Sequence, residues 1–81
     1  MSGQRRTKGS ELEDAEICRR NGWRKGTLLV GDEGYGPTVI RLTAIGESDV
    51  LARRVLQSGK TVDDNEGHWI LTCRNWRRYQ P

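Results

Sequence analysis

The sequence contains no phenylalanine, a single histidine and only two cysteines among its 81 residues. Without phenylalanine, the core has to be built mainly from valine, isoleucine, leucine and tryptophan, and a chain of this length forms one domain with a small core. No apolar run approaches the ~20 residues that a membrane-spanning helix needs. Residues 1–10 lack the apolar stretch of a signal peptide, so we expect a cytoplasmic protein with no membrane partner.

The scarcity of soft ligands argues against a metal site and against catalysis. Cys18, Cys73 and His68 are the only thiol and imidazole side chains, and no Cys-x-x-Cys pair is present. The acids that precede His68 form no recognised motif, so an exposed turn is favoured over a metal-dependent hydrolase. The two cysteines fit free thiols better than a disulfide. We therefore expect no cofactor, no metal and no enzymatic activity.

The net charge of +3 resides in the N-terminal segment. Arg5, Arg6 and Lys8 supply it, whereas residues 11–81 hold eleven basic and eleven acidic side chains. The basic character of the chain therefore reflects its tail, which weakens the inference that it binds nucleic acid. Within residues 11–81 the charges alternate in blocks of opposite sign. Such a pattern is typical of a surface with internal ion pairs, or of a two-signed surface that orients one protein partner.

The chain is predicted to comprise a disordered basic tail (1–9), a short helix (10–22) and a β domain (23–81). Ser10 and Glu13 have the spacing of a capping box, and Gly22 is suited to end the helix. Acidic residues precede basic ones along the helix, which complements its dipole. The apolar stripe is thin, so we expect the helix to dock along one edge only.

From Trp23 onward the apolar residues follow the period of two that is typical of strands. Strands are expected at Lys25–Val30, Thr38–Ile45, Val50–Leu56, His68–Cys73 and Arg77–Gln80. A long loop after the first strand, short hairpins and a tight turn before the last strand predict a mainly β fold, a small SH3-like five-stranded barrel preceded by one short N-terminal helix. Trp69 alternates in phase with Leu71 and is predicted to belong to the core.

The loop Gly31–Pro37 presents one aromatic residue between glycines. Asp32 and Glu33 would repel a phosphate, and a strand follows instead of a helix, so the loop is not a phosphate-binding loop. A rigid turn set by glycine and proline is favoured. In the alternative interpretation, Tyr35 is held out by this turn as a contact residue, and the two acids beside it would suit a basic partner.

The C-terminal aromatic residues, Trp76 and Tyr79, lie among arginines. Either Trp76 plugs the end of the barrel and the arginines form a solvated rim, or arginine and tryptophan together form a contact patch. In an SH3-like barrel the long loop lies near the last turn. A protein-binding site would then combine Asp32, Glu33, Tyr35, Arg74, Trp76, Arg77 and Arg78. A nucleic-acid-binding surface, the alternative, would use Arg53, Arg54, Arg74, Arg77, Arg78 and Tyr79.

Several short strings within residues 23–77 resemble a family of short phage and prophage proteins. They are Gly34-Tyr-Gly-Pro37, Ile40-Arg-Leu-Thr-Ala-Ile-Gly-Glu47, Leu51-Ala52 and Trp69-x-Leu71-x-Cys-Arg-x-Trp76. The family has no established activity, so the resemblance transfers no functional residue. It implies a mobile-element accessory protein that binds, and inhibits, a host or viral protein. We therefore expect a non-catalytic small binding module with a protein partner, and the sequence leaves its oligomeric state open.

Overall fold

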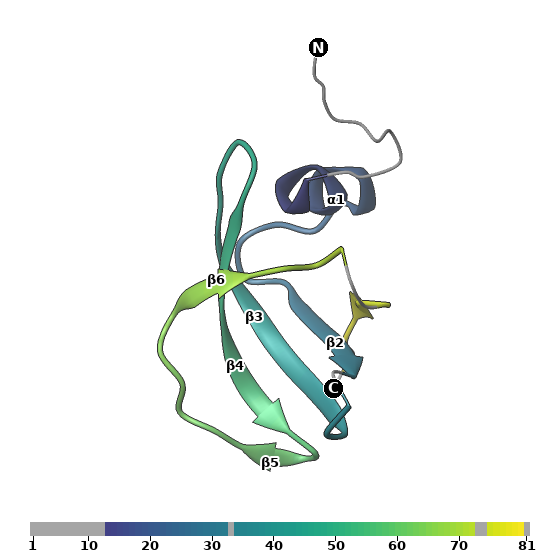
Figure 1. Ribbon diagram of the computed structural model, residues 1–81, viewed down its shortest axis with the longest axis vertical. Coiled ribbons are helices and arrows are strands. Elements are labelled where there is room, and N and C mark those ends of the chain that lie inside the picture. Colours follow the sequence, from purple (N-terminus) through teal and green to yellow (C-terminus); the bar gives the residue numbers. More distant parts are fainter. Residues whose placement is uncertain (1–12, 33, 73–74, 81) are drawn as a thin grey trace.

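The computed structural model describes residues 13–32, 34–72 and 75–80. Within these residues the elements are α1 (Asp14–Asn21), β2 (Leu28–Asp32), β3 (Pro37–Ile45), β4 (Val50–Gln57), β5 (Lys60–Thr61), β6 (Gly67–Trp69) and β7 (Arg77–Arg78). The protein is mainly β, as predicted, and α1 lies at one end of the sheet (Figure 1). In the described part of the chain, no helix has the length and apolar character needed to cross a membrane.

The strands form one antiparallel sheet in the order β5-β4-β3-β2-β7. The strand β6 pairs with Val50–Ala52 of β4, and β5 pairs with Leu56 and Gln57 farther along the same strand. No pairing among the described residues joins β5 or β6 to β7, so the sheet is open and the predicted five-stranded SH3-like barrel is not confirmed. The physical reason is strand length. The strand expected to reach Cys73 ends at Trp69, and the elements at the edges have only two or three residues each.

The central strand β3 is the longest and pairs with a neighbour on each side. It is rich in β-branched and aliphatic residues, which favour extended backbone. Its pairing with β4 shifts register between Val39 and Ile40 and again between Leu42 and Ala44. Irregularities of this kind increase the twist and bend of a strand. The bent sheet can therefore curve around a core that is too small for two full layers.

The first and third hairpins depart from the predicted boundaries because of local turn chemistry. Lys25 and Gly26 form a turn, with Gly26 at φ 94°, so the first strand starts at Leu28 instead of Lys25. The segment after β4, expected as a bend and a loop, contains the short strand β5. Ser58 and Gly59 both have positive φ, at 51° and 83°, which is the two-residue turn that matches the twist of a tight hairpin.

The helix begins at Asp14, four residues later than predicted. Glu13 has extended backbone with φ −74° and ψ 157° and provides no side-chain cap, so it is not in the first helical turn as a capping box with Ser10 requires. Ser10 lies outside the described residues. The predicted end of the helix is confirmed. Gly22 adopts the left-handed conformation, and the amide of Trp23 donates a 2.8 Å hydrogen bond to the carbonyl of Cys18.

The core lies where α1, Leu71 and Trp76 cover the sheet. Its buried members are Ala15, Cys18, Leu29, Ile40, Leu42, Val50, Ala52, Leu71 and Trp76. Trp69 is partly buried and packs against this cluster, as predicted from its phase. Its ring meets the ring of Trp76 edge to face, with centroids 5.9 Å apart. Because Trp69 belongs to β6 and Trp76 immediately precedes β7, this contact joins the two edges of the sheet through side chains.

Trp76 fits into the core only because Gly31 has no side chain. A Cβ at Gly31 would lie 2.8 Å from Cδ2 and Cε3 of Trp76, well inside the contact distance of about 3.5 Å for two carbons. We expect Gly31→Ala to lower the free energy of unfolding by about 1–3 kcal/mol in urea denaturation, because the indole is enclosed and cannot move aside. Gly67→Ala is the matched control, since nothing lies within 4 Å of its added Cβ. Equal effects of the two substitutions would contradict this packing.

Cys18 is a free thiol with no exposed surface, so the free-thiol prediction is confirmed for it, while Cys73 lies outside the described residues. Burial raises the pKa of the Cys18 thiol from its ordinary value of 9.0 to about 11, and the charge of Asp14 acts in the same direction. The folded state therefore holds the thiol proton more tightly than the unfolded chain does. Its contribution to stability is complete below pH 9 and is lost as the pH rises to 11.

We expect Cys18→Ala to remove this component of the pH dependence. The free energy of unfolding of the unchanged protein should fall toward that of the variant between pH 9 and 11, by up to ~1.4 kcal/mol per pH unit. Urea denaturation of both proteins at half-unit steps of pH measures the difference. Titration of lysine and tyrosine is common to both proteins and cancels. Parallel curves across this range would show that the thiol does not ionise on unfolding.

Candidate functional site

The tip of the β2–β3 hairpin carries the most exposed large hydrophobic side chain of the described residues. Tyr35 is 84% exposed. It stands between Gly34 and Gly36, whose φ angles of 105° and 97° are available to glycine and strained for other residues. A carboxylate oxygen of Asp32 accepts a 2.7 Å hydrogen bond from the amide of Gly34, which closes the turn. The rigid turn and the exposed Tyr35 therefore occur together, and Glu33 lies outside the described residues.

The tip is braced by the neighbouring β4–β5 turn. The hydroxyl of Ser58 donates a 2.9 Å hydrogen bond to the carbonyl of Tyr35, and the amide of Ser58 donates a 2.7 Å bond to the carbonyl of Pro37. The Gln57 amide also donates to the Tyr35 carbonyl, at 3.4 Å. Two turns far apart in sequence thus hold each other, and the Tyr35 backbone is fixed while its side chain is free to contact a partner.

Trp76 does not belong to this surface. It is only 8% exposed and is part of the hydrophobic core, so it lies inside the fold, although it plugs no closed barrel, and it does not form the exposed contact patch of the other interpretation. Its indole Nε1 is buried with no hydrogen-bond partner among the described residues. Burying this N–H group without a partner costs free energy. The close packing of the indole ring against Gly31 and Trp69 acts in the opposite direction and favours the buried position.

The two arginines that follow Trp76 are exposed on β7, at the edge of the sheet. Arg77 pairs with Val30 and Arg78 with Leu29, which places β7 beside the strand that leads into the hairpin tip. The prediction that the turn before the last strand lies near the loop after the first strand is met at Trp76, which lies against Gly31. Asp32 is two residues beyond Val30 on the same strand. Arg74 lies outside the described residues.

The arginines of the alternative nucleic-acid surface are engaged with acidic residues. Nη2 of Arg53 lies 3.2 Å from a carboxylate oxygen of Asp63, and Nε of Arg54 lies 2.7 Å from one of Asp64. The sequence indicated only a polar acidic loop at these two aspartates. Because that loop runs beside β4, it neutralises the arginine pair. Tyr79, also on the predicted surface, is half-buried, and its amide donates to the carbonyl of Leu28 at 2.8 Å.

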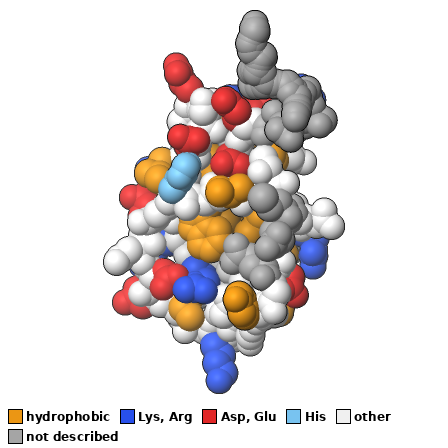
Figure 2. Space-filling view, viewed as in Figure 1, with side chains coloured by type: hydrophobic (Ala, Val, Ile, Leu, Met, Phe, Trp, Pro, Cys, Tyr) orange, Lys and Arg blue, Asp and Glu red, His pale blue; other side chains and the backbone are white. Residues whose placement is uncertain are grey.

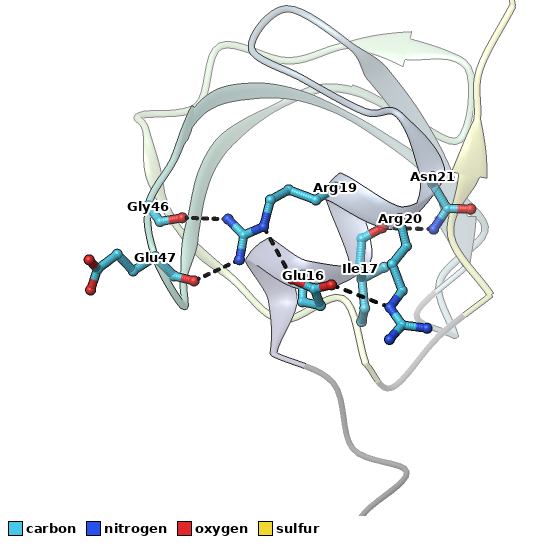
Figure 3. A network of polar contacts seen from close by, with 7 residues as sticks. All are labelled: Glu16, Ile17, Arg19, Arg20, Asn21, Gly46 and Glu47. Atoms are coloured by element: carbon cyan, nitrogen blue, oxygen red, sulfur yellow. Dashed lines mark hydrogen bonds and ion pairs between the residues drawn. The ribbon is translucent and has the colours of Figure 1, made fainter.

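A second set of polar contacts joins α1 to the β3–β4 turn (Figure 3). Arg19 donates from Nη1 to the carbonyl of Gly46 at 3.2 Å and from Nη2 to the carbonyl of Glu47 at 3.0 Å. Its Nε and that of Arg20 both reach the carboxylate of Glu16, at 3.2 and 3.3 Å. These two arginines hold the pKa of Glu16 below its ordinary value. Arg19 therefore anchors the helix to the sheet, while the ion pair of Arg20 lies within the helix.

The structure also gathers three potential metal ligands that the sequence did not connect. One ligand atom each from Asp14, Asp49 and His68 lies within 4.8 Å of the other two. Asp14 opens α1, Asp49 precedes β4 and His68 lies in β6. The sequence-based expectation of no metal considered His68 with the two cysteines and with the acids that closely precede it, and neither Cys18 nor those acids are part of this group. The sequence predicted a hairpin between β4 and β6, but not the register that places Leu51 opposite His68 or the approach of α1 to this end of the sheet.

The described residues form a small, mainly β protein that consists of one open antiparallel sheet and one helix docked against it. Residues 12–81 match DUF7241, a domain of unknown function, and the chain belongs to this family. The match includes α1, whereas the resemblance found in the sequence was confined to residues 23–77. Since Ala15 and Cys18 of α1 are fully buried, the helix is part of the same folding unit. No curated protein and no solved structure matches the chain.

The docking of α1 can be tested with two neighbouring arginines. We expect Arg19→Ala to lower the free energy of unfolding by about 1 kcal/mol, because two backbone carbonyls lose their donor. Arg20→Ala should change it by less than ~0.5 kcal/mol, because it removes only an exposed ion pair within the helix. Urea denaturation measures both. If the two variants are equally stable, the contacts to Gly46 and Glu47 do not anchor the helix.

Proposed function

We propose that the protein is a non-catalytic binding module that recognises another protein through the tip of the β2–β3 hairpin. The observation that carries the proposal is the combination at Tyr35 of 84% exposure with a backbone held in place by Ser58. An exposed aromatic side chain contributes nothing to the core. Its position on a braced turn is therefore better explained by contact with a partner than by folding.

The braced tip lowers the cost of binding. A loop that is already fixed loses little backbone entropy when it meets a partner, and tyrosine has few rotatable bonds for the contact area it provides. Tyrosine is also enriched among the residues that dominate binding energies. The surface proposed here comprises Asp32, Tyr35, Arg77 and Arg78. It differs from the set predicted from the sequence by the removal of Trp76, and Glu33 and Arg74 lie outside the described residues.

The charges beside Tyr35 favour a protein partner with both signs of charge. Asp32 is exposed next to the tip, and Arg77 and Arg78 are exposed on the adjacent edge strand. A surface with both signs fixes the orientation of one protein partner better than it fits the uniform negative charge of a nucleic acid. The resemblance to phage and prophage proteins supports a host or viral protein as the partner, which the module would inhibit, and a cytoplasmic location.

The nucleic-acid alternative is weakened by the ion pairs of β4. Arg53 and Arg54 would have to give up Asp63 and Asp64 before they could bind phosphate. Of the described arginines in that alternative, Arg77 and Arg78 have no such ion pair. Binding to nucleic acid through two free arginines would be weak. Its affinity would also fall less steeply with salt than that of a dedicated binder, which makes six or more phosphate contacts.

The proposal is tested by photo-cross-linking and by one substitution. A photoreactive phenylalanine analogue at position 35 should capture a protein in host lysate, whereas the same analogue at Ile70, which is also exposed, should not. Tyr35→Ala should weaken binding to the captured and purified protein by about 30-fold or more. Because the side chain is exposed, its removal should leave the free energy of unfolding within ~0.5 kcal/mol of the original.

Two results would contradict the proposal. One is binding to the partner that Tyr35→Ala leaves unchanged in a folded protein. The other is tight binding to random-sequence DNA or RNA that falls steeply between 50 and 200 mM salt, by about 10³-fold or more, which requires many phosphate contacts. That second result would assign the function to the arginines instead of the hairpin tip.

A further inference from the structure

We propose that Asp14, Asp49 and His68 form a binding site for a divalent transition-metal ion, with Zn²⁺ as the best-matched ion. The three side chains come from α1, from the turn before β4 and from β6, and their ligand atoms lie within 4.8 Å of one another. Figure 2 shows the single histidine of the chain, in pale blue, at the surface among acidic side chains. This site is separate from the hairpin tip and does not depend on the function proposed for it.

The spacing of the ligand atoms fits a zinc site. Zinc binds imidazole nitrogen and carboxylate oxygen at about 2.0–2.2 Å, so two ligands of a tetrahedral site lie about 3.3 Å apart. Nε2 of His68 lies 3.4 Å from a carboxylate oxygen of Asp49. That pair already has the separation of two zinc ligands, and the ligand oxygen of Asp14, within 4.8 Å of both, would have to approach them when an ion binds.

The backbone around the site holds the ligands in place. The amide of Leu71 donates a 2.8 Å hydrogen bond to one carboxylate oxygen of Asp14, which orients that carboxylate and leaves its second oxygen for a metal. The amide of Ala15 donates a 2.9 Å bond to the carbonyl of Ser48, next to Asp49. On the sheet, Leu51 pairs with His68. Each of the three elements is therefore fixed to another without the ion.

The charge and the ligand types select the ion. Among the described residues no lysine or arginine forms an ion pair with Asp14 or Asp49, so the two carboxylates offer negative charge that a dication would neutralise, with His68 as a neutral ligand. A ligand set that includes imidazole suits zinc and its neighbours, whereas Mg²⁺ and Ca²⁺ prefer oxygen ligands alone. The side chains of His68 and Asp49 are 57% and 69% exposed, so the ion has a path from solvent and a coordination position stays open to water.

The ion would tie the helix to the sheet. Asp14 opens α1, and the other two ligands lie on β6 and on the turn before β4. An ion bound to all three elements in the folded state alone stabilises that state by mass action. Because β3 spans nine residues, about 30 Å of strand, the tip of the β2–β3 hairpin lies at the opposite end from this site (Figure 1).

Titration of the tag-free, metal-stripped protein with Zn²⁺ tests the proposal. Calorimetry should show saturable binding of one ion, and the midpoint of thermal unfolding should rise with the concentration of Zn²⁺. The same titrations with Mg²⁺ and Ca²⁺ should show at least about tenfold weaker binding. With Co²⁺ as the probe, the visible spectrum should indicate nitrogen and oxygen ligands, without the near-ultraviolet charge-transfer band of a cobalt–thiolate bond.

Three variants and one control assign the ligands. His68→Gln, Asp49→Asn and Asp14→Asn should each weaken Zn²⁺ binding by at least about tenfold. Asp14→Asn keeps an oxygen that accepts the Leu71 amide, so the helix stays docked. Asp63→Asn removes an exposed carboxylate outside the cluster and should leave the affinity unchanged. Three results would each overturn the proposal. They are no saturable binding, variants that bind Zn²⁺ as tightly as the unchanged protein, and a cobalt–thiolate band that survives His68→Gln.

Discussion

The contact between Trp69 and Trp76 joins the two edges of the open sheet. Trp69 lies in β6 on one edge of the sheet, Trp76 precedes β7 on the other, and their rings meet edge to face at 5.9 Å. Gly31 provides the space that Trp76 fills. An 81-residue chain without phenylalanine can enclose only a small core, and its edge strands are too short to close by backbone hydrogen bonds. Side-chain packing completes the enclosure where the ladder of hydrogen bonds ends.

That enclosure positions the two candidate surfaces. The placement of β7 along β2 brings Arg77 and Arg78 beside the hairpin that presents Tyr35. The placement of β6 along β4 brings His68 to Asp49, and the helix adds Asp14 at the same end. One set of edge pairings therefore creates a proposed protein-binding tip at one end of the sheet and a proposed metal site at the other (Figure 1).

Several of the alternating charge blocks in the chain form contacts that hold the fold together. Arg53 and Arg54 meet the acidic loop at 63–64, and Arg19 holds the helix to the turn at Gly46. The expectation that such blocks form internal ion pairs is confirmed for these arginines. Arg77 and Arg78, in contrast, are exposed on the edge strand beside the hairpin tip, which is why that surface, and not the arginine-rich strand β4, supports the proposed function.

The sequence by itself determined the mainly β fold, the glycine that ends the helix, the extent of β3 within one residue and the rigid loop around Tyr35, because these depend on local periodicity and turn chemistry. Local signals could not decide whether the sheet closes, since closure depends on how far short edge strands pair. They also could not decide whether Trp76 is buried in the core or exposed in a contact patch, or which side chains lie near His68. Those were set by contacts between residues distant in sequence, the packing of Trp76 on Gly31 and the approach of Asp14 and Asp49 to His68, which only the tertiary structure brings together.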